Sequence, residues 1–191
     1  MEKKCIFQLK IIPEYQPINA LFRGYCLTIF EDGQIILSIE LPMEITQSIG
    51  CFPEMAKNIM RIIESHSETL NELKDFYYSE GYTDETFVNF NFGDIQIKSS
   101  DICRHSDKYI EDIRITNAPN HEKYIEDIKK AAPILDIYDE IALEYNKYIE
   151  ETEFHLTITK QDIENKLSSD PGIENITGAY DFMLELCNPF R

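Results

Sequence analysis

The chain of 191 residues contains no tryptophan, only seven glycines and no long apolar run, and these absences exclude several classes of protein. No stretch approaches the roughly 20 apolar residues that a membrane-spanning helix needs, so we expect no membrane span. The glycine-rich phosphate loops G-x-G-x-x-G and G-x-x-x-x-G-K-[ST] are both missing from the sequence. The G-x-S-x-G nucleophile elbow is missing as well. The sequence therefore indicates neither a common nucleotide-binding enzyme nor a common serine hydrolase.

Basic residues are also scarce, with 18 Lys and Arg against 35 Asp and Glu, which gives a net charge of −17. A protein that binds the phosphate backbone needs a basic face, and an anionic membrane surface repels an acidic protein. We therefore expect neither a direct nucleic-acid partner nor a membrane partner. The excess acid lies after residue 50, where 29 acidic residues stand against 14 basic ones.

The five cysteines are an odd number, are widely spaced and form no C-x-x-C pair. This usage is typical of free thiols in a reducing compartment. Residues 1–7 begin like a signal peptide, but Gln8 and Lys10 interrupt the apolar region and no small-residue cleavage site follows. The sequence therefore predicts a cytoplasmic protein.

Alternating apolar and polar residues predict a β section at the N-terminus. Strands are expected at residues 4–12, 21–30 and 34–41, and the last two are joined through Asp32-Gly33, a strong hairpin signal. We expect Pro42 to end this part of the sheet.

Apolar residues at three- and four-residue spacing then predict a long helix over residues 53–78. The next expected elements are strands 86–92 and 94–98 around Gly93-Asp94, a possible strand 109–116, helices 121–132 and 133–151, strand 154–158, a helix through 167 capped by Thr159, and a last helix 173–187. The prediction is one α+β domain over residues 1–191, with antiparallel sheet, long amphipathic helices packed on one side, and the approximate order βββ-α-ββ(β)-αα-β-αα.

The helix predicted over residues 133–151 divides into an apolar face and an acidic face. The apolar face contains Ile134, Tyr138, Ile141, Tyr145, Tyr148 and Ile149. The opposite face contains Asp136, Asp139, Glu140, Glu144, Glu150 and Glu151. Like charges four residues apart slightly destabilise a helix, so this arrangement gives the fold no advantage.

A second acidic cluster, with tyrosines among the acids, is predicted within residues 68–85. Both clusters have two interpretations: solvated faces that keep the protein soluble, or a docking face for a basic protein. For the docking interpretation, the residues expected to contact the partner are Asp136, Asp139, Glu140, Glu144, Glu151, Glu72, Asp75, Tyr78 and Tyr82.

The alternative from another class is a small metal- or thiol-dependent enzyme or ligand-binding domain. His105, Asp107 and His155 have the residue types of an open two-histidine, one-carboxylate metal site. Cys103, two residues before His105, could be a thiol activated by neighbouring positive charge. A histidine near an acid is common by chance in so acidic a chain, and the Cys103–His105 pair is typical of a chance pair in a polar loop. We therefore expect no catalytic residue, no metal and no cofactor. A structural subunit of a larger assembly is a third alternative, which an exposed apolar patch would reveal.

In size, charge and lack of a catalytic signature, the chain is similar to the small acidic immunity proteins that neutralise bacterial toxins and to acidic phage-encoded inhibitors of host defence. This resemblance rests on no specific residues. It implies a non-enzymatic protein that blocks a basic partner, such as a toxin or a defence effector, and in its extreme form a nucleic-acid mimic. The leading hypothesis is therefore an inhibitor that docks through its acidic helix faces.

Overall fold

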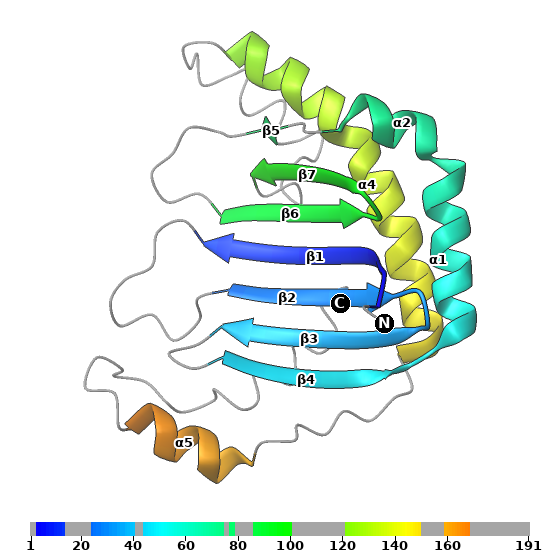
Figure 1. Cartoon of the computed structure of the whole chain (residues 1–191). Coiled ribbons are helices and arrows are strands. Elements are labelled where there is room, and N and C mark those ends of the chain that lie inside the picture. Colours follow the sequence, from blue (N-terminus) through cyan, green and yellow to red (C-terminus); the bar gives the residue numbers. More distant parts are fainter. Residues whose placement is uncertain are drawn as a thin grey trace.

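The computed structural model describes residues 3–13, 24–40, 44–74, 77–78, 86–100, 121–149 and 159–168. Its strands are β1 (Cys5–Pro13), β2 (Gly24–Phe30), β3 (Gln34–Glu40), β4 (Glu44–Cys51), β5 (Tyr77–Tyr78), β6 (Thr86–Phe92) and β7 (Ile95–Ser100). Its helices are α1 (Pro53–Ser65), α2 (Ser67–Glu72), α4 (His121–Ile149) and α5 (Lys160–Ser168), and Figure 1 shows how these elements are arranged.

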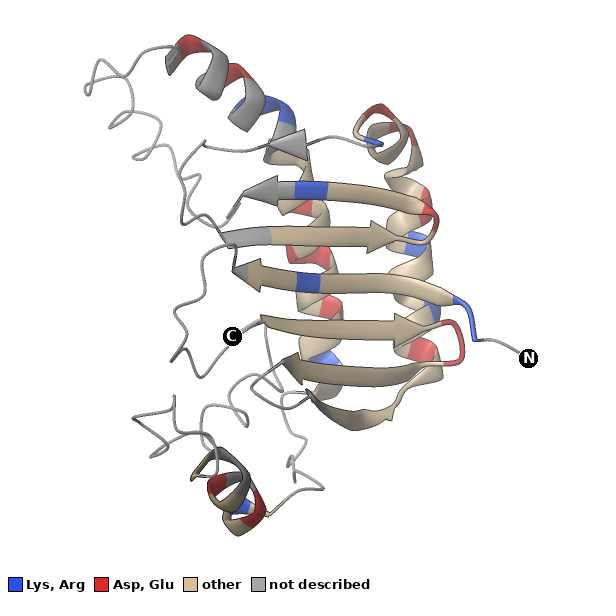
Figure 2. Ribbon diagram, turned by 60° about the vertical axis from the view of Figure 1, so that its left-hand side comes forward, with Lys and Arg blue, Asp and Glu red and all other residues tan. Residues whose placement is uncertain are grey.

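The described strands form one sheet in the order β4-β3-β2-β1-β6-β7-β5. Neighbouring strands are antiparallel except the short β5, which pairs in parallel with β7. Helices α1 and α4 lie side by side across the same face of this sheet, and most charged residues lie on the helices and turns rather than on the strands (Figure 2). The predicted α+β class is confirmed.

The strands alternate as their sequences predict, which places the core between the sheet and the two helices. On β1, Phe7 and Leu9 are buried, whereas the intervening Gln8 and the following Lys10 lie on the opposite face. The core joins the sheet to both helices through the side chains of Phe7, Leu27, Leu37, Phe90, Met55, Ile59, Ile134, Ile141 and Tyr145. Full burial of one such side chain stabilises the fold by about 1.5–3 kcal/mol.

Polar side chains link neighbouring strands on the sheet face opposite the helices. The Gln8 amide Nε2 donates to Thr28 Oγ1 at 3.1 Å, and Asn91 Nδ2 donates to Gln8 Oε1 at 2.9 Å. Because β1 lies between β2 and β6, the two bonds run across three strands. The two faces of the sheet therefore differ in chemistry: one is apolar and covered by helices, and the other carries many polar side chains.

The predicted turn between β2 and β3 is confirmed and is built around Gly33. Its amide donates to Phe30 O at 2.9 Å, and its φ of 87° lies in the left-handed region that favours glycine. A Cβ at this position would lie 2.4 Å from both Phe52 C and Pro53 N. The close approach matters because Phe52 N donates to Gly33 O at 2.8 Å, so the turn rests directly on the start of α1.

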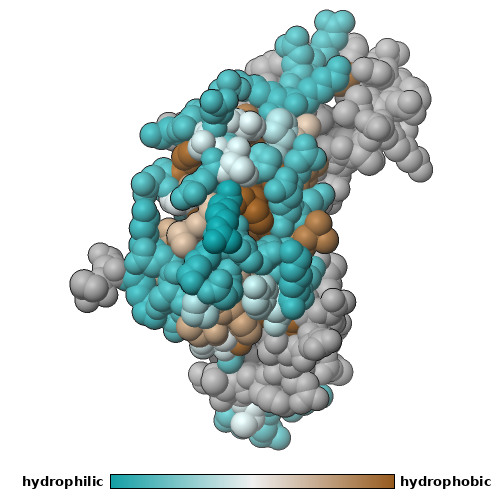
Figure 3. Space-filling model, turned by 90° about the vertical axis from the view of Figure 1, so that its right-hand side faces the viewer, coloured by the Kyte–Doolittle hydropathy of each residue, from teal (hydrophilic) through white to brown (hydrophobic). Residues whose placement is uncertain are grey.

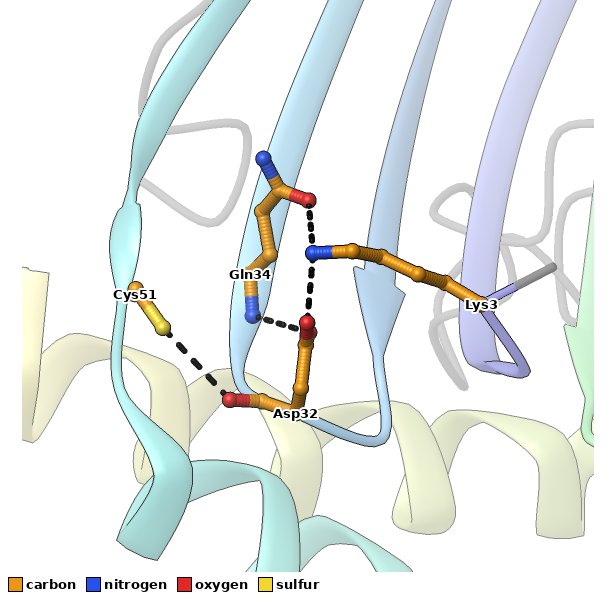
Figure 4. A network of polar contacts seen from close by, with 4 residues as sticks. All are labelled: Lys3, Asp32, Gln34 and Cys51. Carbon is orange, nitrogen blue, oxygen red and sulfur yellow. Dashed lines mark hydrogen bonds and ion pairs between the residues drawn. The ribbon is translucent and has the colours of Figure 1, made fainter. Parts of the chain in front are cut away.

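Asp32, beside Gly33, is the centre of a polar network that holds this turn to its neighbours (Figure 4). Its carboxylate accepts the backbone N–H of Gln34 at 3.0 Å and pairs with the Lys3 ammonium, which also donates to Gln34 Oε1 at 2.7 Å. These bonds hold the pKa of Asp32 below its ordinary value. Cys51 Sγ completes the network, at 3.5 Å from the carbonyl oxygen of Asp32.

Strand β4 is absent from the sequence prediction, which ended this part of the sheet at Pro42. Residues Glu44–Cys51 pair antiparallel with β3, and Leu37 lies opposite Gln47. The strand escaped prediction because a polar residue interrupts its apolar alternation: Gln47 is buried, and its Nε2 donates to Ser48 O at 2.8 Å. Because its amide group is hydrogen-bonded to the backbone, Gln47 can occupy a core position where the alternating pattern predicts an apolar residue.

The prediction of one continuous helix over residues 53–78 is wrong. The chain leaves the helical conformation at His66, with φ −103° and ψ 15°, so that α1 and α2 are separate helices. Helix α2 ends at Glu72, and Tyr77–Tyr78 belong to β5 beside β7. Pairing with β7 determines that Tyr77–Tyr78 form a strand and not a helix. Tyrosine is a good strand former, and the edge of β7 offers backbone hydrogen-bond partners.

The two helices predicted over residues 121–132 and 133–151 are one helix, α4, with Pro133 in its interior. A proline inside a helix removes one hydrogen bond and disfavours the helix. Here Ile125 on one side of the proline and Ile134 and Ile137 on the other are all buried. Burial of apolar residues on both sides of Pro133 holds the helix continuous where the local sequence predicts a boundary.

Two further predicted features are confirmed: the Gly93-Asp94 turn between β6 and β7, and the cap of α5 by Thr159. The Asp162 N–H donates to Thr159 Oγ1 at 3.1 Å, and that hydroxyl donates to the Asp162 carboxylate at 2.6 Å. The strands predicted at 109–116 and 154–158 and the helix at 173–187 lie outside the described residues.

Candidate functional site

Between residues 136 and 143, the outer face of α4 has three acids and one leucine, and the exposed Lys147 follows on the next turn. Asp136, Asp139, Glu140 and Leu143 are all exposed, and at 100° per residue they fall within about 100° of one another around the helix. We call these four residues the acidic stripe. The apolar face predicted for this helix lies opposite, where Ile134, Ile141, Tyr145 and Ile149 are buried. The amphipathic pattern of α4 therefore presents the acidic stripe to solvent.

Leu143 distinguishes the acidic stripe from an ordinary solvated helix face. Its residue surface is 66% exposed, and it is the one large apolar residue of the described chain that is so exposed. The side of the molecule that carries α1 is mainly hydrophilic, with only small and separate hydrophobic patches (Figure 3). Leu143 is not among the residues predicted to contact the partner, although a leucine out of phase with the apolar face of its helix is a signal that could have identified it.

Asp136 and Asp139 form no ion pair with any residue in the part of the chain that the structure describes. Glu140 differs, because its Oε1 lies 3.0 Å from His66 Nε2 at the junction of α1 and α2. The ring of His66 is half-buried and hydrogen-bonded through this contact. The acidic stripe thus combines two unpaired carboxylates with one that also ties the helices together.

Glu144 was predicted to lie on the same exposed face, and this prediction is wrong. Its residue surface is only 5% exposed, because one further residue after Leu143 turns the side chain toward α1. Asn58 Nδ2 donates to Glu144 Oε1 at 2.7 Å, and the Lys147 ammonium donates to the other oxygen. Burial alone would raise the pKa of Glu144, but these hydrogen bonds outweigh it and hold the pKa below its ordinary value.

The second predicted cluster is described only in part. Glu72 is exposed at the end of α2, as is Glu68 one turn earlier. Tyr78 lies in β5, where its backbone pairs with Ser99, but its side chain lies outside what the structure describes. Three other residues predicted to contact the partner lie outside the described residues: Asp75, Tyr82 and Glu151.

The residues of the alternative metal or thiol site, Cys103, His105, Asp107 and His155, also lie outside the described residues. Within the described ranges, no three His, Cys, Asp or Glu side chains are grouped so that they could hold a metal ion. Cys5 and Cys26 are free, and burial raises the pKa of each thiol. A raised thiol pKa lowers the fraction of reactive thiolate at neutral pH.

Comparison with models of known protein families and with curated proteins found no match to this chain. Among the described helices, we find no segment with the length and hydropathy of a membrane span.

Proposed function

We propose that the chain is a non-enzymatic acidic binding protein that inhibits a basic protein partner and docks on it through the acidic stripe of α4. One observation carries this proposal: Leu143, 66% exposed, lies on the same helix face as Asp139 one turn before it and Asp136 two turns before it, two exposed carboxylates without an ion pair to a described residue. A protein interface has an apolar centre surrounded by a polar, solvent-accessible rim, and this arrangement of Leu143 and the two carboxylates has that form. The exposure of Leu143 beside Asp136 and Asp139 does not contribute to the stability of the isolated fold.

The carboxylates and the leucine have different tasks in this proposal. Complementary charge speeds the encounter with a cationic surface and penalises wrong partners. Burial of the exposed Leu143 in the complex then slows dissociation. Inhibition follows when the stripe covers a positively charged functional site of the partner, as an immunity protein covers a toxin or a viral inhibitor covers a defence effector. The free thiols of Cys5, Cys26 and Cys51 support action in the cytoplasm.

The test is capture of a partner by the tagged chain from a lysate of its own host, compared between two matched variants. The test variant, Asp136→Lys/Asp139→Lys, reverses two charges of the acidic stripe. The control variant, Glu122→Lys/Glu126→Lys, makes the same change at two exposed acids near the start of α4, beside Lys129 and Lys130. Both changes are at exposed side chains, so both variants should fold normally.

The proposal expects one stoichiometric basic protein on the wild-type chain and on the control variant, its release at high salt, and its loss from the test variant. The activity of the captured protein should fall in proportion to the amount of added chain. An empty capture, or equal retention by the two variants, contradicts the proposal.

A further inference from the structure

A small pocket lies between α1 and the ends of the strands, on a different flank of α1 from the one that contacts α4. Its volume is about 170 Å³. Three apolar side chains form its floor and wall: the buried Ile6 and the half-buried Met60 and Ile63. Three exposed charged residues stand around it: Lys4, Glu31 and Glu64. The pocket is thus apolar inside and charged at its rim.

Backbone hydrogen bonds between β1 and the two neighbouring turns fix the sheet side of the pocket. The Glu31 N–H donates to Lys4 O at 3.0 Å, and the Gly93 N–H donates to Ile6 O at 2.9 Å. The start of β1 is therefore held between the β2–β3 turn and the β6–β7 turn. Because α1 packs on the same strand, the pocket lies between elements with regular hydrogen bonding rather than on a free loop.

The acids at the rim have no partners of their own among the described residues. Glu31 and Glu64 form no ion pair with Lys4 or with any other described cation. Acids close by in the chain are paired: Asp32 with Lys3, and Glu54 with Lys57. With two carboxylates and one ammonium, the rim has a net charge of −1 and matches a ligand with one positive charge.

We propose that this pocket binds one arginine side chain of a basic protein partner, and the source of that arginine rests on the proposed function. The three methylenes of the arginine pack on Ile6, Met60 and Ile63. The guanidinium group lies at the rim and has five N–H donors, enough in number for hydrogen bonds to the carboxylates of both Glu31 and Glu64. The pocket would make arginine an anchor of the interface, a role in which this residue is enriched.

Size and charge argue against a large ligand, an anionic ligand and an uncharged apolar side chain. Pockets that hold cofactors or drug-sized ligands measure roughly 300–1,000 Å³, well above the volume of this one. An anionic ligand would meet two carboxylates at the rim and only one ammonium. An uncharged apolar side chain would fit the floor but would leave both carboxylates without a partner.

The test is an NMR titration of the ¹⁵N-labelled full chain with N-acetyl-arginine amide, at constant ionic strength. N-acetyl-citrulline amide is the control ligand, because it has nearly the same shape without the charge. We expect saturable chemical-shift changes at the backbone amides of Lys4, Glu31 and Gly93. N-acetyl-citrulline amide should bind at least about tenfold more weakly than the arginine compound. Glu64→Gln should weaken arginine binding about threefold or more, whereas Glu54→Gln, an exposed acid outside the pocket, should change it less than about twofold.

Equal binding of the two ligands, equal loss in Glu64→Gln and Glu54→Gln, or the absence of saturable shifts at these amides would each overturn the pocket proposal. The variant Asp136→Lys/Asp139→Lys separates this result from the proposed function, because it should leave the arginine titration unchanged. If a partner is captured and Glu31→Gln/Glu64→Gln binds it as wild type does, the pocket proposal alone fails. If no partner is captured but the arginine titration succeeds, the proposed function alone fails.

Discussion

Asn58 on α1 donates a hydrogen bond of 2.7 Å to the buried carboxylate of Glu144 on α4, 86 positions further along the chain. This bond, with the ion pair between Glu144 and Lys147, satisfies an acid that would be costly to bury alone. It divides the acids of α4 into two groups. Glu144 holds the helices together, whereas Asp136 and Asp139 remain available on the surface.

Glu144→Ala should destabilise the fold, because it leaves the Asn58 amide without its acceptor in a partly buried position. We expect the free energy of unfolding to fall by about 1–3 kcal/mol. Asp139→Ala, an exposed acid on the same helix, should change it by less than about 0.5 kcal/mol. Chemical denaturation of the two variants measures both values. Equal effects would show that the Asn58–Glu144 bond does not stabilise the fold.

The pH dependence of stability should also depend on Glu144. Its folded-state pKa is below the ordinary value, so its stabilising contribution is present above the unfolded-state pKa of about 4.3 and is lost as pH falls through the folded pKa. Glu144→Gln removes this contribution. The difference in unfolding free energy between wild type and variant should therefore shrink as the pH is lowered from 6 toward about 3. Parallel curves over this range would contradict the assignment.

Gly33→Ala and Gly93→Ala should differ strongly in stability, although both glycines have positive φ. A Cβ at Gly33 would lie 2.4 Å from backbone atoms of Phe52 and Pro53, whereas a Cβ at Gly93 would meet no atom within 4 Å. We expect Gly93→Ala to cost about 1 kcal/mol, the price of the left-handed conformation alone. Gly33→Ala should cost at least about 2 kcal/mol, because the backbone of α1 must also move. Equal melting temperatures for the two variants would exclude the close contact at Gly33.

Pro133→Ala tests whether α4 is continuous. Inside a helix, replacing proline with alanine restores a hydrogen bond to the carbonyl of Lys129, and we expect the free energy of unfolding to rise by about 1–3 kcal/mol. Pro53→Ala is the matched control, because Pro53 is the first residue of α1 and lacks no helical hydrogen bond there. It should give no gain. A null effect at Pro133 would favour two separate helices instead of one.

Local signals predicted much of this fold correctly. The strands 4–12 and 86–92, the turns at Gly33 and Gly93 and the cap at Thr159 all depend on residues close in sequence, and the structure contains each of them. The errors arose where contacts with residues distant in the sequence determine the secondary structure. Residues Glu44–Cys51 pair with β3 as strand β4 although Gln47 interrupts the apolar pattern. Tyr77–Tyr78 pair with the edge of β7, whereas helical spacing had predicted a helix there.

The candidate site was predictable only in outline. Helical periodicity correctly placed Asp136, Asp139 and Glu140 on the exposed face of α4. It could not place Glu144, because the position of α1 beside α4 determines whether that side chain meets solvent or Asn58. The pocket beside α1 also escaped prediction, since it combines residues from β1, both turns and a helix.

Docking through the acidic stripe is tested most directly by the affinity of the captured basic protein for three forms of the chain, measured by titration calorimetry at low and high salt. The forms are wild type, Asp136→Lys/Asp139→Lys, and the control Glu122→Lys/Glu126→Lys. If the acidic stripe docks on the partner, the stripe variant should bind at least about tenfold more weakly at low salt, and the control variant should stay within about threefold of wild type. High salt should reduce the difference in affinity between the two variants. Equal affinities for the two variants would contradict a docking role for the acidic stripe.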